Sequence, residues 1–220
     1  MTTTIPVDIW SDIACPWCFI GKRRFEAALA ILAEEGITAE VTYHSYELAP
    51  DTPVDFGGSE IDFLATHKGM PRAQVEQMLG QVTAVAAAEG LAYDFDALQH
   101  RNTVQAHELL HFARETGSDT ALLEGLFSAY FEKGADIGDR DELVRLAVAA
   151  GLDGDAARAA LESGQYVERV RADEEQARRI GVNGVPFYVL DGRYGVSGAQ
   201  EAAVFADALR QVAGEKTATP

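Results

Sequence analysis

The hydrophobic pattern of the chain begins with a period of two. Ile5, Val7 and Ile9 alternate with other residues, which predicts a strand with one side facing a core. From Phe19 onward, apolar residues recur at three- and four-residue intervals, as on one face of a helix. A third run, over about residues 40–48, is rich in residues that strands favour. The pattern therefore predicts a strand, a helix and a second strand in succession.

The middle of the chain has a different pattern from its two ends. After residue 53 the apolar residues keep helical spacing for more than a hundred residues. A period of two then returns at residues 186–190 and 193–197, and Asp191-Gly192 between these runs is a strong signal for a hairpin turn. One more helix follows. We place a domain boundary near residue 53, where this change in pattern begins.

Composition and charge exclude several classes of protein. The chain has 35 acidic and 18 basic residues and a formal net charge of -17, which repels a phosphate backbone, so we expect no nucleic-acid partner. No stretch approaches the roughly 18 apolar residues of a membrane span, and the start lacks the basic and apolar segments of a signal peptide. We therefore expect a cytoplasmic protein without a membrane partner. The sequence leaves both a monomer and a homodimer open.

Cys15 and Cys18 are the two cysteines of the sequence, and Pro16 and Trp17 lie between them. They follow the first predicted strand and lie where the first predicted helix begins. A bridge that closes a ring of about four residues stabilises a fold by only roughly 2 kcal/mol, and short strained bridges are the labile kind. The pair is therefore better explained by reactivity than by structural stabilisation.

The place of the two cysteines at the start of a helix predicts their roles. Disulfide exchange needs a thiolate that attacks a sulfur and a second thiol that resolves the mixed disulfide. A helix N-terminus stabilises a thiolate, so we expect Cys15 to be exposed and to attack, and Cys18, one turn further in, to resolve. The basic side chains at residues 22–24 would add positive charge, although a solvated helix face explains them equally well.

The Cys-Pro-Trp-Cys motif, the long helical segment and the Gly-Val-Pro-Phe sequence at residues 184–187 together resemble the DsbA-like proteins, in particular their FrnE-type branch. The resemblance covers nearly the whole chain. It implies an α/β fold, namely a thioredoxin fold interrupted by an all-helical insertion. By this resemblance, residues 1–52 and 165–220 form the discontinuous thioredoxin-fold domain, and residues 53–164 form the insertion domain.

The same resemblance implies roles for residues far from the cysteines. It implies that Pro186 is cis and faces the redox pair, and that the backbone of Val185 pairs with substrate. Asn102 and His107 resemble a polar cluster that the FrnE-type branch keeps near its cysteines. His44, on the second predicted strand, is also a candidate for the vicinity of the active site.

The predicted function is thiol:disulfide exchange on protein or small-molecule thiols, with no cofactor besides the cysteine pair and with glutathione as one candidate co-substrate. Two alternatives stay open. Glutathione-dependent isomerases of the 2-hydroxychromene-2-carboxylate type and kappa-class transferases have similar architectures, but generally carry serine where this chain has Cys15. The other alternative is a chaperone-like binding module in which the cysteines act only as a redox sensor.

The segment from His107 to His111 matches the H-E-x-x-H pattern of zinc peptidases, with Glu108 as the general base. The segment is predicted to be helical, so the two histidines would lie one turn apart on the same face. The longer form of the motif is absent, because Arg114 and Gly117 stand where glycine and histidine are required. A catalytic zinc also needs a third protein ligand. Glu124 or Glu132 could serve, but nothing else in the sequence supports either. We therefore expect no metal site.

Overall fold

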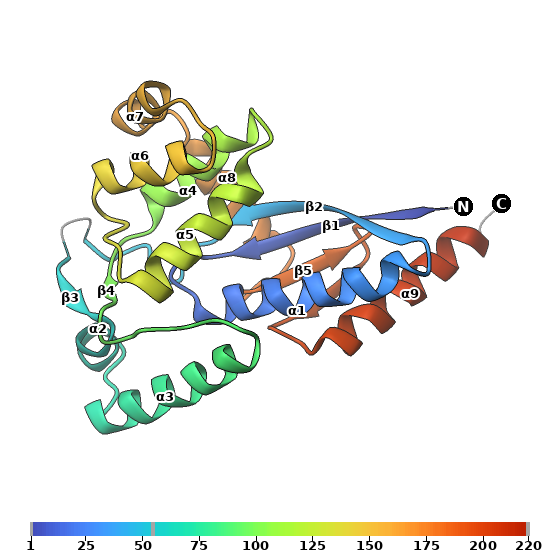
Figure 1. The fold of residues 1–220 in the computed structure, drawn as a ribbon, viewed down its shortest axis with the longest axis horizontal. Helices are drawn as coiled ribbons and strands as arrows, with labels where there is room; N and C mark the ends of the chain where they lie inside the picture. Colours follow the sequence, from blue (N-terminus) through green and yellow to red (C-terminus); the bar gives the residue numbers. More distant parts are fainter. Residues whose placement is uncertain (1, 54–55, 219–220) are drawn as a thin grey trace.

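The N-terminal part of the chain folds as a parallel strand–helix–strand unit. The computed structural model describes residues 2–53 and 56–218. Strand β1 (Thr3–Ser11) is followed by helix α1 (Pro16–Ala33) and strand β2 (Ile37–Ser45), in the predicted order. β1 and β2 pair in parallel along their whole length. In Figure 1, α1 runs alongside the sheet.

The predicted hairpin near the C-terminal end completes the sheet. It consists of β5 (Phe187–Leu190) and β6 (Tyr194–Ser197), and the strand order is β2-β1-β5-β6, with β5 antiparallel to β1. Asp191 and Gly192 in the turn have φ values of 53° and 64°, in the left-handed region that such a turn requires. The two ends of the chain therefore share one sheet.

Helices cover both faces of this sheet. Ile5, Val7 and Ile9 pack against residues of α1 and α9, whereas Trp10 points to the opposite face and packs against Ala177 of α8. Successive residues of β1 therefore face two different hydrophobic cores, one on each side of the sheet. The helices that follow the insertion are α8 (Val167–Arg179) and α9 (Ala202–Ala218).

The insertion lies at the end of the sheet where β1 ends (Figure 1). It is not entirely helical, because β3 (Gly58–Ser59) and β4 (Gln99–His100) pair antiparallel. Strands of two residues are too short to show an alternating pattern, so they cannot be recognised from the hydrophobic pattern. No described helix is long and apolar enough to cross a membrane. The helices of the insertion are α2 (Glu60–His67), α3 (Arg72–Ala88), α4 (Val104–Arg114), α5 (Asp119–Lys133), α6 (Arg140–Ala149) and α7 (Gly154–Ser163).

Strand β2 begins and ends about three residues earlier than the pattern predicts. It begins at Ile37, directly after the turn that ends at Gly36, where φ is 74°. It ends at Ser45 because the following backbone has other partners: the N–H of Leu48 donates to Asp12 Oδ2 at 2.8 Å. This bond ties residues 46–48 to the turn that precedes the cysteines.

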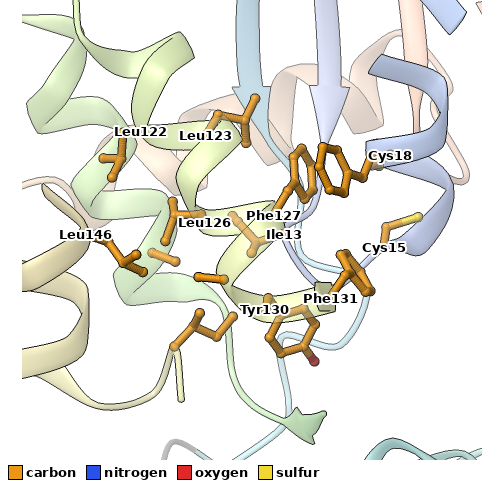
Figure 2. Packing of buried hydrophobic residues seen from close by; sticks show 14 of the residues in the cluster. Ile13, Cys15, Cys18, Leu122, Leu123, Leu126, Phe127, Tyr130, Phe131 and Leu146 are labelled. Atoms are coloured by element: carbon orange, nitrogen blue, oxygen red, sulfur yellow. The ribbon is translucent and has the colours of Figure 1, made fainter. Parts of the chain in front are cut away.

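The cysteines belong to the core that joins the sheet to the insertion. Cys15, Cys18 and Phe19 are in one buried cluster with apolar residues of α3, α4 and α5. Figure 2 shows Cys15 and Cys18 beside the aromatic side chains of α5. The rings of Phe19 and Phe127 stack with their centroids 5.0 Å apart. The helical insertion therefore forms one wall around the cysteine pair.

Candidate active site

The turn between β1 and α1 presents the cysteine pair. The N–H of Cys15 donates to the carbonyl of Asp12 at 3.1 Å, and the N–H of Cys18 donates to the carbonyl of Cys15 at 3.0 Å. Cys15 is the N-cap residue of α1, and Pro16 occupies the first helical position, where its missing N–H costs nothing. The predicted position of the motif at a helix N-terminus is confirmed.

Both cysteines are free thiols, and they approach each other to 3.5 Å. Each is only 3% exposed, so the expectation that Cys15 is exposed is wrong. The insertion and residues 48–49 enclose it, and Cys15 lines a cavity instead of the outer surface. Trp17, in contrast, is 40% exposed, as its place between the two cysteines allows.

Burial determines the protonation of the inner thiol. Desolvation raises the pKa of Cys18 well above its usual value, and the hydrogen bond and charge of Cys15 raise it further. A hydrogen bond from Ser11 and one from the backbone of Asp12 act in the opposite direction without reversing the shift. Cys18 is therefore held as a neutral thiol, which is suited to staying protonated while Cys15 reacts.

A segment far along the chain contacts the outer thiol. The Val185–Pro186 peptide bond is cis, as the resemblance implied, and Cys15 Sγ donates to the carbonyl oxygen of Val185 at 3.4 Å. The close approach of this segment to α1 depends on Gly21. A Cβ at that position would lie 3.0 Å from Pro186 Cγ and 2.7 Å from Tyr188 Oη.

A cavity of about 220 Å³ opens beside Cys15. Asp12 and Thr103 line it at the cysteine end, and the Glu60–His100 pair lines another part. Lys68 and Arg101 also line it, and its remaining walls are apolar and come mainly from α2 and α3. The apolar side chains are Phe63, Leu64, Met78, Leu79, Val82 and Phe95. The site therefore combines a reactive sulfur with an apolar binding space.

The basic residues at the start of α1 are neither a solvated face nor uncompensated charge beside the thiol. Lys22 is 4% exposed and pairs with Glu124 of α5 at 2.7 Å and with Glu26. Arg23 pairs with the same two glutamates. Arg24 pairs with Glu89, which directly follows α3, and with Glu201, which directly precedes α9. These side chains tie α1 to its neighbours, and their charges are compensated by acidic partners.

Of the remaining sequence candidates, His107 contacts the turn that carries the cysteines. Its Nε2 lies 3.3 Å from Asp12 Oδ1, and both side chains are buried. Asp12 Oδ1 also accepts from the N–H of Ala14 at 3.3 Å. Through Asp12, His107 therefore supports the turn that carries Cys15. It is not among the residues that line the cavity.

Asn102 and His44 have other contacts. Asn102 Nδ2 donates to the carbonyl of Thr52, and its Oδ1 accepts from the N–H of Val104 at the start of α4. His44 lies between Asp8 and Asp173, in contact with both carboxylates. Neither side chain is among those that line the cavity beside Cys15. Their contacts are those of residues that hold elements together.

The two histidines of the H-E-x-x-H pattern face different carboxylates. His107 contacts Asp12, whereas His111 Nε2 lies 3.3 Å from Asp173 Oδ2 and 3.2 Å from Ser45 Oγ. Burial raises the pKa of Glu108. The described residues include no group of three or more His, Cys, Asp or Glu side chains that could hold a metal ion. The helix spacing alone does not create a metal site here.

Sequence reasoning missed several polar residues that line the cavity, among them Asp12, Glu60 and His100. Asp12 lies three residues before Cys15. Its position directly after the first strand is the one sequence feature that could have marked it as a site residue. Glu60 and His100 come together only through the short β3–β4 ladder, so no local sequence pattern predicts their contact. Their contact is 2.8 Å between Glu60 Oε2 and His100 Nδ1.

Comparison with known proteins identifies close relatives. The family model described as "DSBA-like thioredoxin domain" matches residues 6–210. The crystal structure of the probable DsbA oxidoreductase SCO1869 from Streptomyces coelicolor is 44% identical, with a TM-score of 0.90, and the match covers 98% of this chain and 92% of that one. The uncharacterized protein YwbO from Bacillus subtilis is 29% identical over 210 residues, covering 94% of this chain and 96% of the relative.

A more distant structure shares the fold. The cytosolic disulfide reductase DsbM from Pseudomonas aeruginosa is 19% identical, with a TM-score of 0.63, over 96% of this chain and 98% of that one. The same protein has also been solved with GSH. At this identity the likeness concerns the arrangement of the elements. It confirms a thioredoxin-type fold with a helical insertion.

Proposed function

The chain belongs to the DSBA-like thioredoxin domain family, and on this premise we propose that it is a thiol:disulfide oxidoreductase whose redox centre is Cys15 and Cys18. The observation that carries the proposal is the pair of free thiols, 3.5 Å apart, at the N-terminus of α1. The carbonyl of Val185 lies against the outer thiol of this pair.

In the oxidising direction, a substrate thiolate attacks Cys15 Sγ of the Cys15–Cys18 disulfide. A bond forms between the substrate sulfur and Cys15 as the Cys15–Cys18 bond breaks, and Cys18 leaves with the electron pair. Burial and its contact with Cys15 favour the protonated form of Cys18, so this thiolate takes up a proton. A second substrate thiolate then attacks the substrate sulfur and releases the Cys15 thiolate, which the N-terminus of α1 stabilises.

Val185 has a role in both states of Cys15. Its carbonyl accepts a hydrogen bond from the free thiol. Once Cys15 is bonded to a substrate sulfur, that thiol proton is gone and the carbonyl can accept a hydrogen bond from the substrate. We propose that Val185 and Pro186 form the substrate-facing edge of the site, and that Pro16 and Trp17 form its rim.

Exchange is tested by following reduction of the Cys15–Cys18 disulfide with a small thiol, and oxidation of a reduced substrate, in the wild type and in Cys15→Ser. The variant should lose turnover completely. A Cys18→Ser variant mixed with the disulfide form of the small thiol should instead accumulate a mixed disulfide at Cys15, detectable by its mass, because the Cys15 thiolate attacks that disulfide and releases one molecule of the small thiol. Full turnover in Cys15→Ser would contradict the proposal.

The two alternatives give different results in the same system. A glutathione-dependent isomerase would show saturation with glutathione and product formation without a net redox change. A chaperone-like module would suppress aggregation equally well when both cysteines are replaced by serine. Two cysteines in contact favour dithiol exchange over either alternative. We also propose that the protein acts in the cytoplasm.

A further inference from the structure

The cavity beside Cys15 contains a buried pair that thiol exchange does not use. Nδ1 of His100 lies 2.8 Å from Oε2 of Glu60. The His100 ring stacks on Phe63, with the ring centroids 3.4 Å apart. All three residues line the cavity that Cys15 also lines. The imidazole is therefore fixed by a carboxylate and by an aromatic ring, as part of the cavity wall.

One nitrogen of this imidazole lacks a partner. His100 is 4% exposed, and its Nε2 has no hydrogen-bond partner among the described residues. With Glu60 as the acceptor at Nδ1, the tautomer that carries its proton on Nδ1 has a lone pair on Nε2. Nearly all buried polar atoms in folded proteins have partners. A donor group on a molecule inside the cavity would supply the missing one.

The size and access of the cavity indicate a small molecule. Its volume of about 220 Å³ exceeds the roughly 150 Å³ of an engineered apolar cavity that binds benzene. The lining residues other than Asp12, Glu60, Lys68, His100, Arg101 and Thr103 are apolar, which suits a ring. Cys15 is only 3% exposed, so a molecule that enters the cavity reaches its sulfur more readily than a disulfide on the surface of a folded protein.

We propose that the cavity binds a single-ring aromatic thiol and that Nε2 of His100 accepts a hydrogen bond from a donor group, such as a phenolic hydroxyl, on that molecule. This inference rests on the proposed exchange at Cys15, because it names the substrate class. The aromatic thiolate attacks Cys15 Sγ, and the Cys15–Cys18 bond breaks. Cys18 takes up the proton that the aromatic thiol has lost, and a second aromatic thiolate releases the aromatic disulfide.

Binding of phenol and of anisole to the full chain separates recognition from redox chemistry. The two ligands share a ring, but anisole has no O–H donor. Wild-type protein should bind phenol about fivefold more tightly than anisole, the range expected for one hydrogen bond. His100→Phe keeps a ring against Phe63 and removes Nε2, so it should bind both ligands equally. His100→Gln, with an amide oxygen near the position of Nε2, should recover part of the preference.

A measurement on the wild type alone covers the case in which His100→Phe does not fold. In a ¹⁵N NMR titration, phenol should shift the Nε2 signal of His100 and anisole should leave it in place. Equal binding of the two ligands, an unchanged preference in folded His100→Phe, or a shift confined to His107 or His111 would each overturn the proposal.

The outcomes distinguish this inference from the proposed function. Neither ligand contains sulfur, so a failure of thiol exchange would abolish turnover and leave the phenol preference intact. A failure of the inference would remove the preference while exchange at Cys15 continues. If a reduced unfolded protein were oxidised faster than 4-mercaptophenol, and His100→Phe left the rate with 4-mercaptophenol unchanged, the cavity would instead hold a protein side chain, which contradicts the proposal.

Discussion

The thiol of Cys15 and the carbonyl oxygen of Val185 lie 3.4 Å apart, although 170 residues separate them in the sequence. The antiparallel pairing of β5 with β1 causes this contact, because Trp10 near the end of β1 lies opposite Phe187 at the start of β5. The segment that precedes β5 is therefore held beside the turn that follows β1. Both halves of the proposed redox site depend on this one register.

Alkylation should modify Cys15 before Cys18. Burial and the contact with Cys15 raise the pKa of Cys18, so Cys18 contributes little thiolate near neutral pH, while Cys15 lines an open cavity. Only the thiolate reacts rapidly, so we expect a clear difference in labelling rate in favour of Cys15. Peptide mapping by mass spectrometry after limited labelling with iodoacetamide measures it. Faster labelling of Cys18 would reverse the assigned roles.

The sequence predicted local elements well because their signals are local. The alternation of Ile5, Val7 and Ile9 and the Asp191-Gly192 turn each depend on neighbouring residues, and both appear in the structure. The redox motif was found in the same way. The cis Val185–Pro186 bond was anticipated only through the family resemblance.

Features that depend on distant segments could not be predicted. The burial of Cys15 results from helices of the insertion that pack beside it. The contact between Glu60 and His100 joins residues 40 positions apart. One of the two ion pairs of Lys22 is with Glu124, which is 102 residues away. None of these relationships leaves a periodic pattern in the sequence.

Gly21→Ala should destabilise the protein by about 1–3 kcal/mol, the usual cost of inserting a group into a packed region. The added Cβ would lie 2.7 Å from Tyr188 Oη and 3.0 Å from Pro186 Cγ. Either α1 or the segment at Pro186 has to move, so exchange at Cys15 should also slow. Urea denaturation and the rate of reduction of the disulfide measure the two effects.

Gly80→Ala is the matched control for this change. Gly80 also lies within a helix, α3, but an added Cβ there meets no atom within 4 Å. Alanine favours helices over glycine by up to about 1 kcal/mol, so this variant should be as stable as the wild type or more stable. If the two variants had equal stability, close packing at Gly21 would not be the cause.

Asp12→Ala should loosen the turn that carries Cys15. The carboxylate accepts from the N–H groups of Ala14 and Leu48 and contacts His107. Loss of a buried acceptor leaves these donors unsatisfied, at about 1–3 kcal/mol. The free energy of unfolding should fall by that amount, and exchange should slow. Asp51→Ala, at an exposed position, is the control and should change neither quantity; equal effects would contradict the role of Asp12.

The stability of the protein should decrease as pH rises through the titration of His44. Its Nε2 lies 2.8 Å from Asp8 Oδ1, and its Nδ1 lies 3.1 Å from Asp173 Oδ1. Burial alone would lower the pKa of His44, but the hydrogen bonds and charges of Asp173 and Asp8 outweigh it, so the net effect is to raise the pKa. In the unfolded chain a histidine has a pKa of about 6.5.

A histidine whose pKa is higher in the folded state binds its proton more tightly there, so its protonation stabilises the fold. This contribution is complete below a pH of about 6.5 and is lost as pH rises through the folded-state pKa. Hydrogen bonds from His111, His44 and the Ser45 N–H outweigh the effect of burial and lower the pKa of Asp173 well below its usual value, so Asp173 stays ionised throughout this window. Urea denaturation at a series of pH values should therefore show a steeper decline for the wild type than for His44→Gln. Asp8→Asn, which keeps an acceptor but removes one charge, should give an intermediate decline, and identical slopes in all three proteins would show that His44 is not the group that titrates.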